Sequence, residues 1–135
     1  MVNMTIAINA IPTKQQELRQ ALDELIPLIR HESGCLQCSL VHKNGDTNML
    51  TVSEEWADRE DMINHVRSEY FRVLIGAIRV LAQSAEMTLN TESQTIRRDV
   101  ELSPSFQNIY PWIENMLSES SLHRYQHCAG SLPGS

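Results

Sequence analysis

Residues 54–71 constrain the fold of this chain more than any other stretch. They begin with Glu54-Glu55-Trp56 and pass through a short acidic segment into a helical pattern. Asp58 stands where its carboxylate can accept a backbone N–H one turn later and so begin the helix. Apolar residues then recur at helical spacing and give the helix one buried face: Met62, Val66, Phe71, Leu74, Ile78 and Leu81. The stretch predicts a strand end joined tightly to an amphipathic helix.

His65 is the one titratable side chain on that apolar stripe. An imidazole changes its charge near neutral pH and can therefore transfer protons under physiological conditions. A cavity with one such group among apolar neighbours suits small aromatic ligands. A histidine that points inward from a helix is also a common core residue held by hydrogen bonds, so His65 has both a catalytic and a packing interpretation.

The remaining chain divides into strand and helix patterns. Alternating or β-branched residues predict four strands: 2–11, 35–43, 49–56 and 85–91. Helical spacing predicts two helices: 12–33 and 58–83. Within the second helix, Ser68 is placed to cap a new segment, and Asn-Gly-Asp at 44–46 predicts a hairpin turn. The order βαββαβ is the split-βαβ plan, so we expect an α+β domain with a four-stranded antiparallel sheet.

The first helix carries start, bend and stop signals. Pro12 and Thr13 begin it, and Thr13 with Gln16 has the spacing of a capping box. Pro27 removes one backbone hydrogen bond and predicts a kink. Gly34 predicts the end of the helix.

Two helices cover only one face of such a sheet. The strand residues Ile6, Ile8, Val52 and Leu89, together with their opposite-face neighbours, leave few strands purely polar on the outside. A symmetric partner is the economical cover for the second face. The pattern predicts a homodimer that forms through the sheet face.

Composition excludes several classes of function. The chain has 135 residues, of which 41% are hydrophobic, as expected for one globular domain. A net charge of -6 argues against nucleic acid and anionic membranes as partners. No apolar run reaches the length of a membrane span, and residues 1–11 lack the pattern of a signal peptide. We therefore expect a cytoplasmic protein without membrane or nucleic-acid partners.

Cys35 and Cys38 form a Cys-x-x-Cys motif, which occurs in redox and zinc sites. Residues three apart on a strand point to opposite faces, and no second cysteine pair follows in the sequence. Two small thiols without metal are the favoured interpretation. His123, His127 and Cys128 lie near one another in the tail, but their spacing matches no closed zinc site.

The order of motifs resembles the antibiotic biosynthesis monooxygenase family. The resemblance rests on Glu-Glu-Trp at 54–56, the acidic helix start, and His65-x-x-Ser68-x-x-Phe71. Ser-Gly-Cys-Leu at 33–36 looks like the beginning of that family's second strand. The resemblance covers about residues 2–92 and implies a ferredoxin-like domain that pairs into a dimeric α/β barrel. It does not fix the substrate.

Members of the resembled family oxidise electron-rich phenols without flavin or metal. The resemblance implies that His65 is the base or the partner of an anion, that Trp56 forms an aromatic wall, and that Asn9 hydrogen-bonds a substrate carbonyl. Met62, Phe71 and Leu74 would line the pocket. Asn9 and Trp56 also have plain interpretations, as a sheet amide and a core side chain.

The expected function is cofactor-independent monooxygenation of a quinol or polycyclic phenol by dioxygen. No glycine-rich dinucleotide loop is present, and residues 72–83 lack the histidine that a haem-degrading relative would need. We therefore expect no cofactor and no metal. Two alternatives stay open: a dimeric module that binds small molecules without catalysis, and an isomerase in which His65 moves protons without oxygen.

The chain changes character after Glu92. We expect a family-like domain over residues 1–92 and an extension over residues 93–135. Ile96, Val100 and Leu102 predict an additional arm, and residues 104–117 are amphipathic at helical spacing. This segment would cover either the cavity mouth, the partner subunit, or apolar surface of its own subunit. Residues 118–135 are serine-rich and are expected to fray.

Overall fold

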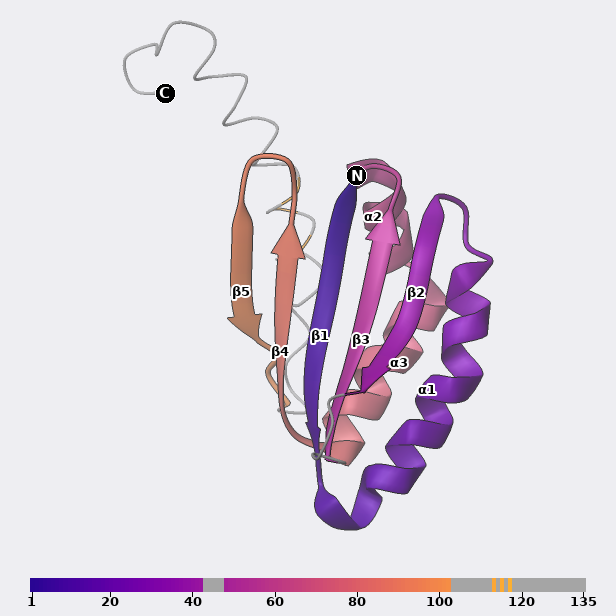
Figure 1. Cartoon of the computed structure of the whole chain (residues 1–135), viewed down its shortest axis with the longest axis vertical. Coiled ribbons are helices and arrows are strands. Elements are labelled where there is room, and N and C mark those ends of the chain that lie inside the picture. Colours follow the sequence, from indigo (N-terminus) through magenta and orange to yellow (C-terminus); the bar gives the residue numbers. More distant parts are fainter. Residues whose placement is uncertain (43–47, 103–112, 114, 116, 118–135) are drawn as a thin grey trace, which may run out of the picture.

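A computed structural model describes residues 1–42 and 48–102, together with residues 113, 115 and 117. Its strands form one antiparallel sheet in the order β2-β3-β1-β4-β5. The helices lie together on one face of that sheet (Figure 1). The element bounds are β1 Val2–Ala10, η1 Pro12–Lys14, α1 Gln15–Arg30, β2 Cys35–His42, β3 Met49–Trp56, α2 Arg59–Val66, α3 Glu69–Leu81, β4 Ala82–Asn90 and β5 Thr95–Asp99. The predicted α+β fold is confirmed, and β5 adds a fifth strand to it. The predicted turn at 44–46 lies outside the described residues.

β1 is the central strand, and its alternation decides which face of the sheet is buried. Its even-numbered residues are buried against the helices, whereas the odd-numbered ones are only partly covered. On β3 the same alternation buries Val52, Glu54 and Trp56. Because a strand turns successive side chains to opposite faces, Glu54 lies on the helix side of the sheet with Trp56.

The start of the first helix differs from the prediction. Pro12 occupies the first turn of a short 3-10 segment that has Ile11 as its N-cap, and no side chain caps either η1 or α1. The capping box between Thr13 and Gln16 is therefore wrong. The fixed φ of Pro12 favours the start of a helical turn at that residue, which places Thr13 inside the turn. α1 runs through Pro27 to Arg30.

Both predicted caps of the second helical region are confirmed. The backbone N–H of Asp61 donates to Asp58 Oδ1 at 2.9 Å and begins α2. The N–H of Phe71 donates to Ser68 Oγ at 3.3 Å and begins α3. Two caps divide the predicted long helix into two, so α2 is a short helix whose inner face presents His65.

The extension joins the same sheet and the same core. β5 pairs with β4, and Ile96 lies opposite Leu89. Val100, Ile113 and Leu117 belong to the buried apolar cluster, while residues 113, 115 and 117 are helical. The rest of the predicted helix over 104–117 and the tail residues His123, His127 and Cys128 lie outside the described residues. Within the described ranges, no helix is long and apolar enough to cross a membrane.

A β-bulge corrects the prediction for the two cysteines. Cys35 lies opposite Trp56 and Cys38 opposite Glu54, with Leu36 as an additional residue in β2. Two residues of one strand therefore oppose one residue of the other, and Cys35 and Cys38 share a face despite their spacing of three. The prediction that they point to opposite faces is wrong.

Candidate functional site: a buried histidine between two carboxylates

His65 lies on the inner face of α2, and its side chain is fully buried. Nδ1 is hydrogen-bonded to Glu32 Oε2 at 2.8 Å. Nε2 lies 3.0 Å from Glu54 Oε1. The second contact has the distance of an ion pair but does not meet the geometry of a hydrogen bond. One imidazole therefore links two carboxylates from different parts of the chain.

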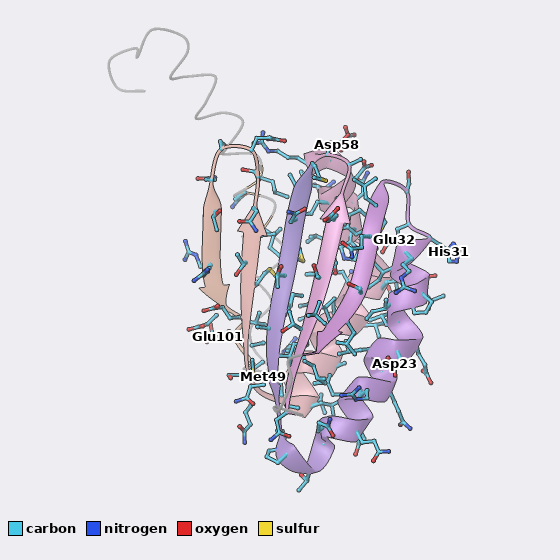
Figure 2. All side chains as sticks on the ribbon, in the orientation of Figure 1. Asp23, His31, Glu32, Met49, Asp58 and Glu101 are labelled. Carbon is cyan, nitrogen blue, oxygen red and sulfur yellow. The ribbon has the colours of Figure 1, made fainter. Side chains whose placement is uncertain are left out.

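The two carboxylates differ in their exposure. Glu32 belongs to the turn between α1 and β2, and its side chain is 15% exposed, whereas that of Glu54 is fully buried. In Figure 2, Glu32 lies beside the sheet, whereas His31 points away from the molecule. The row Glu32–His65–Glu54 therefore runs from near the surface into the core.

Glu54 uses only one of its two carboxylate oxygens. Oε1 accepts a hydrogen bond from Trp56 Nε1 at 2.9 Å and contacts His65. Oε2 is buried and has no hydrogen-bond partner among the described residues. Buried carboxylate oxygens normally have donors because desolvation is costly, so this oxygen is the unusual atom of the site.

Aromatic rings enclose the imidazole. The Trp56 ring stacks on it with centroids 4.4 Å apart and an interplanar angle of 25°. Phe71 contacts it edge-on, with centroids 5.2 Å apart. Trp56 comes from the end of β3 and Phe71 from the first turn of α3. The site therefore holds the imidazole against one stacked ring and one ring in edge contact.

The electrostatic surroundings hold His65 in its charged form. Burial alone lowers the pKa of an imidazole, but the hydrogen bond to Glu32 and the contact with Glu54 outweigh it and raise the pKa of His65 to about 9. At neutral pH the ring is therefore an imidazolium with two N–H donors. In this state it stabilises an anion and does not accept a proton.

The structure brings most of the predicted site residues to one region. His65, Trp56 and Phe71 are in ring contact, and Met62 and Leu74 are buried in the surrounding core. Asn9 is not among them. It lies on the partly covered face of β1, where its amide donates to Gln83 Oε1 at 3.5 Å.

Asn9 is also far along the strand. Val2 lies opposite Trp56, and Asn9 follows seven residues later, roughly 23 Å at about 3.3 Å per residue. The two ends of β1 therefore hold different groups of predicted residues.

Sequence reasoning missed Glu32 and Glu54. Glu54 carried a usable signal, because it alternates with Val52 and Trp56 and so had to share their inward face. Glu32 had none, since it sits in a turn whose path depends on how α1 packs. The pairing of both with His65 is a tertiary result.

The cysteines beside the site are unreactive thiols. Burial and the charge of Glu54 raise the pKa of both Cys35 and Cys38, and a high pKa disfavours the reactive thiolate. Both are free thiols. Among the described residues, no cluster of His, Cys, Asp and Glu could hold a metal.

Two surface hollows flank Arg30, next to the site. One of about 310 Å³ lies between α1 and β2, and one of about 320 Å³ follows residues 35–39 of β2. Arg30 lines both hollows, and its Nε–H donates to the Cys38 carbonyl at 2.7 Å. Neither hollow is lined by His65 or Glu54.

Comparison with known proteins places the chain. The family model for antibiotic biosynthesis monooxygenase matches residues 1–76, more than half of the 135 residues. The chain belongs to the antibiotic biosynthesis monooxygenase family. The match ends within α3, so β4 and β5 of this antibiotic biosynthesis monooxygenase family member lie beyond it. No curated protein matches the sequence.

Solved structures share its fold at low sequence identity. A Pseudomonas aeruginosa protein is 24% identical, with a TM-score of 0.60 over 72% of this chain and 92% of that one. A Mycobacterium tuberculosis protein is 22% identical, with a TM-score of 0.61 over 67% and 92%. A structure described as an antibiotic biosynthesis monooxygenase is 24% identical, with a TM-score of 0.62 over 67% and 97%. At such identities the likeness shows the fold alone.

Proposed function

We propose that this chain is a cofactor-independent monooxygenase that oxidises a quinol or polycyclic phenol with dioxygen. The observation that carries the proposal is the buried row Glu32–His65–Glu54 against the rings of Trp56 and Phe71. Buried ion pairs are weak sources of stability, and charged groups with perturbed pKa values gather at functional sites. The family name supports the same class of reaction.

The proposed reaction needs no external reductant. A phenol whose ring can tautomerise to a CH₂ group loses a proton, and its anion gives one electron to dioxygen. The two radicals combine into a peroxide, which loses water and leaves a carbonyl. One oxygen atom ends in the product and one in water, and the CH₂ carbon supplies all four electrons. The protein must bind the ring, manage the proton and exclude water.

The residues divide these tasks. The charge of His65 suits it to stabilising the substrate anion rather than to removing the proton. Trp56, Phe71, Met62 and Leu74 would form the apolar wall against the substrate ring, and all four are buried in one core.

Oxygen uptake without added cofactor tests the proposal. Purified protein is assayed over a panel of dihydroxynaphthalenes and anthrones, beside the variants His65→Gln and His31→Gln. We expect uptake that falls about a hundredfold in His65→Gln. His31 is exposed at the end of α1, so the matched variant should stay within about twofold of wild type.

Other outcomes separate the alternatives. Turnover that continues without oxygen would favour a proton-transfer isomerase on the same scaffold. Binding of aromatic compounds without any turnover would favour a binding module. Uptake unchanged in His65→Gln would remove this histidine from the chemistry.

We further propose that two copies pair through the sheet face opposite the helices. Several neighbouring side chains on that face are short, so a second sheet can approach closely there: Thr5, Ala7, Thr51, Ser53 and Thr88. The longer Glu86 stands opposite Ala7. Light scattering should give twice the 15.4 kDa mass of the chain, and Ala7→Glu should halve it. Gln20→Glu, an exposed change on α1, should leave the dimer intact.

A further inference from the structure

We propose that Glu54 contacts the ligand of this site through Oε2, and that this ligand is a neutral hydroxyl compound rather than an anion. The inference rests on the proposed function, because it names the form of substrate that the same site accepts. It adds Glu54 as a residue that touches substrate, and it predicts that the site prefers neutral ligands to anionic ones.

The two oxygens of the Glu54 carboxylate are used unequally. Oε1 is held by Trp56 Nε1 at 2.9 Å and by His65 Nε2 at 3.0 Å. These contacts fix the carboxylate, while Oε2 remains buried without a partner among the described residues. A fixed, desolvated acceptor is satisfied by a donor, and a ligand O–H supplies one.

The two residues that lie opposite Glu54 in the sheet are uncharged. In the sheet, Met4 on β1 and Cys38 on β2 lie opposite Glu54, and His65 approaches from α2. Met4 is apolar, and burial with the charge of Glu54 raises the pKa of the Cys38 thiol, which stays protonated. Neither neighbour places an anion beside Oε2, and neither is hydrogen-bonded to it.

The charges of the row Glu32–His65–Glu54 do not cancel. Glu32 and Glu54 carry two negative charges and His65 carries one positive charge, which leaves one net negative charge. Arg30 at the end of α1 is a further cation beside β2, but it is an exposed residue whose Nε–H donates to the Cys38 carbonyl. An anionic ligand would meet repulsion in this desolvated place, whereas a neutral O–H donates to Oε2 without adding charge.

The same arrangement suits proton transfer. When the proton moves from the ligand oxygen to Glu54 Oε2, the O–H bond of the ligand breaks and a carboxylic O–H bond forms. The total charge of ligand and row does not change. The imidazolium of His65, formerly paired with the Glu54 anion, then stabilises the new ligand anion.

Binding without turnover tests the inference. The indole N–H of Trp56 donates to the same carboxylate, so its NMR signal reports on Glu54. The chain has two tryptophans, and Trp112→Phe identifies the Trp56 signal. Under argon at pH 7, 2-naphthol and 1,4-dihydroxynaphthalene serve as neutral probes, and 2-naphthoate is the anionic probe with the same ring system. We expect the neutral probes to shift the signal and bind at least tenfold more tightly than 2-naphthoate.

Two variants separate Glu54 from its charge alone. Glu54→Gln should weaken 2-naphthol binding at least tenfold and improve 2-naphthoate binding. The amide oxygen stays with the Trp56 N–H, so an NH₂ donor replaces the acceptor Oε2, and one negative charge is lost. Glu55→Gln removes the same charge on the opposite face of β3 and should behave as wild type. If Glu54→Gln does not fold, the ratio of the wild-type affinities for 2-naphthol and 2-naphthoate tests the inference by itself.

Several results would overturn the inference. They are equal affinity for 2-naphthoate and 2-naphthol, no binding of either neutral probe, and unchanged 2-naphthol affinity in Glu54→Gln. A crystal structure with 2-naphthol that keeps an ordered water on Oε2 would assign this oxygen to a structural water instead.

The inference and the proposed function can fail separately. Binding that depends on Glu54 without oxygen uptake would retain the inference for a binding protein and exclude the oxygenase. Oxygen uptake that is undiminished in Glu54→Gln would retain the oxygenase and remove Glu54 from it.

Discussion

At the scale of single residues, His65 carries a charge in a place where burial alone would remove it. Its two carboxylate partners restore that charge, so folding and protonation are linked. The unfolded imidazole has a pKa of 6.5 and the folded one a pKa of about 9. The stabilisation is therefore fully present below about pH 6.5, declines above it, and is lost as the pH rises through 9.

This linkage predicts a difference between wild type and His65→Gln. The shift of the His65 pKa corresponds to about 3 kcal/mol of stability at low pH, so wild type should lose about that much more than the variant between pH 6 and 10. Urea unfolding across this range measures it. Cys35 and Cys38 also titrate at alkaline pH, but they contribute equally to both proteins. Parallel pH curves would contradict a charged His65.

Gly34 occupies a position that only glycine can adopt without strain. Its φ is +83°, and a Cβ there would clash with the side chain of Asp61. We expect Gly34→Ala to lower the free energy of unfolding by about 1–3 kcal/mol. The matched change Gly76→Ala has open space and sits within α3, so it should raise stability by about 0.5–1 kcal/mol. Thermal unfolding of both variants measures these changes in stability. A Gly34→Ala variant as stable as wild type would count against this turn geometry.

Helical spacing placed His65 and Phe71 on one stripe, because helical periodicity is a local rule, whereas Trp56 joined them only through the family resemblance. Glu54 was within reach of the same rule and was overlooked. Glu32 was beyond it, because a turn residue has no periodicity. Asn9 was placed by resemblance alone, and the geometry of β1 sets it on the other face.

At the scale of elements, the predictions succeeded where a signal was local. The caps at Asp58 and Ser68 were predicted because a short side chain at a helix start bonds a nearby N–H. The capping box at Thr13 failed because Pro12 began the helical turn one residue earlier. The shared face of Cys35 and Cys38 was missed because a bulge is decided between two strands and not within one.

β2 is an edge strand of the described sheet, and Arg30 protects it. The outer side of β2 carries the exposed Leu36 and Val41, and Arg30 occupies the Cys38 carbonyl. Free strand edges invite pairing with other chains. We expect Arg30→Ala to aggregate faster at 37 °C, as measured by light scattering. Arg72→Ala, which removes an exposed charge from α3, is the control, and equal aggregation of both variants would contradict the role of Arg30.

At the scale of the whole molecule, the order βαββαβ followed from periodicity alone, and the fifth strand did not. β5 is short and mostly exposed, so its pattern is weak. Its place beside β4 becomes favourable only because β4 offers an edge and Leu89 a neighbour for Ile96.

The extension after residue 92 contributes buried side chains to the core. Ile113 and Leu117 are buried, whereas Asn115 between them is exposed. Ile113→Ala and Leu117→Ala should each lower stability by about 2–4 kcal/mol. Asn115→Ala should change it by less than about 0.5 kcal/mol. Urea unfolding of the three variants measures this, and small effects at all three positions would show that the core folds without the extension.

The two bulges of the sheet have a consequence for how such a chain can change over time. Leu36 lets Cys35 and Cys38 share a face, and Gln83 does the same for Ala82 and Ala85 in β4. Each bulge shifts the inward and outward alternation of its strand by one residue. Loss of one residue elsewhere in β2 or β4 would turn part of the strand inside out, unless the neighbouring bulge disappeared or a new one arose. Insertions and deletions in these strands should therefore be inherited in compensating pairs, much as one reading-frame mutation suppresses another.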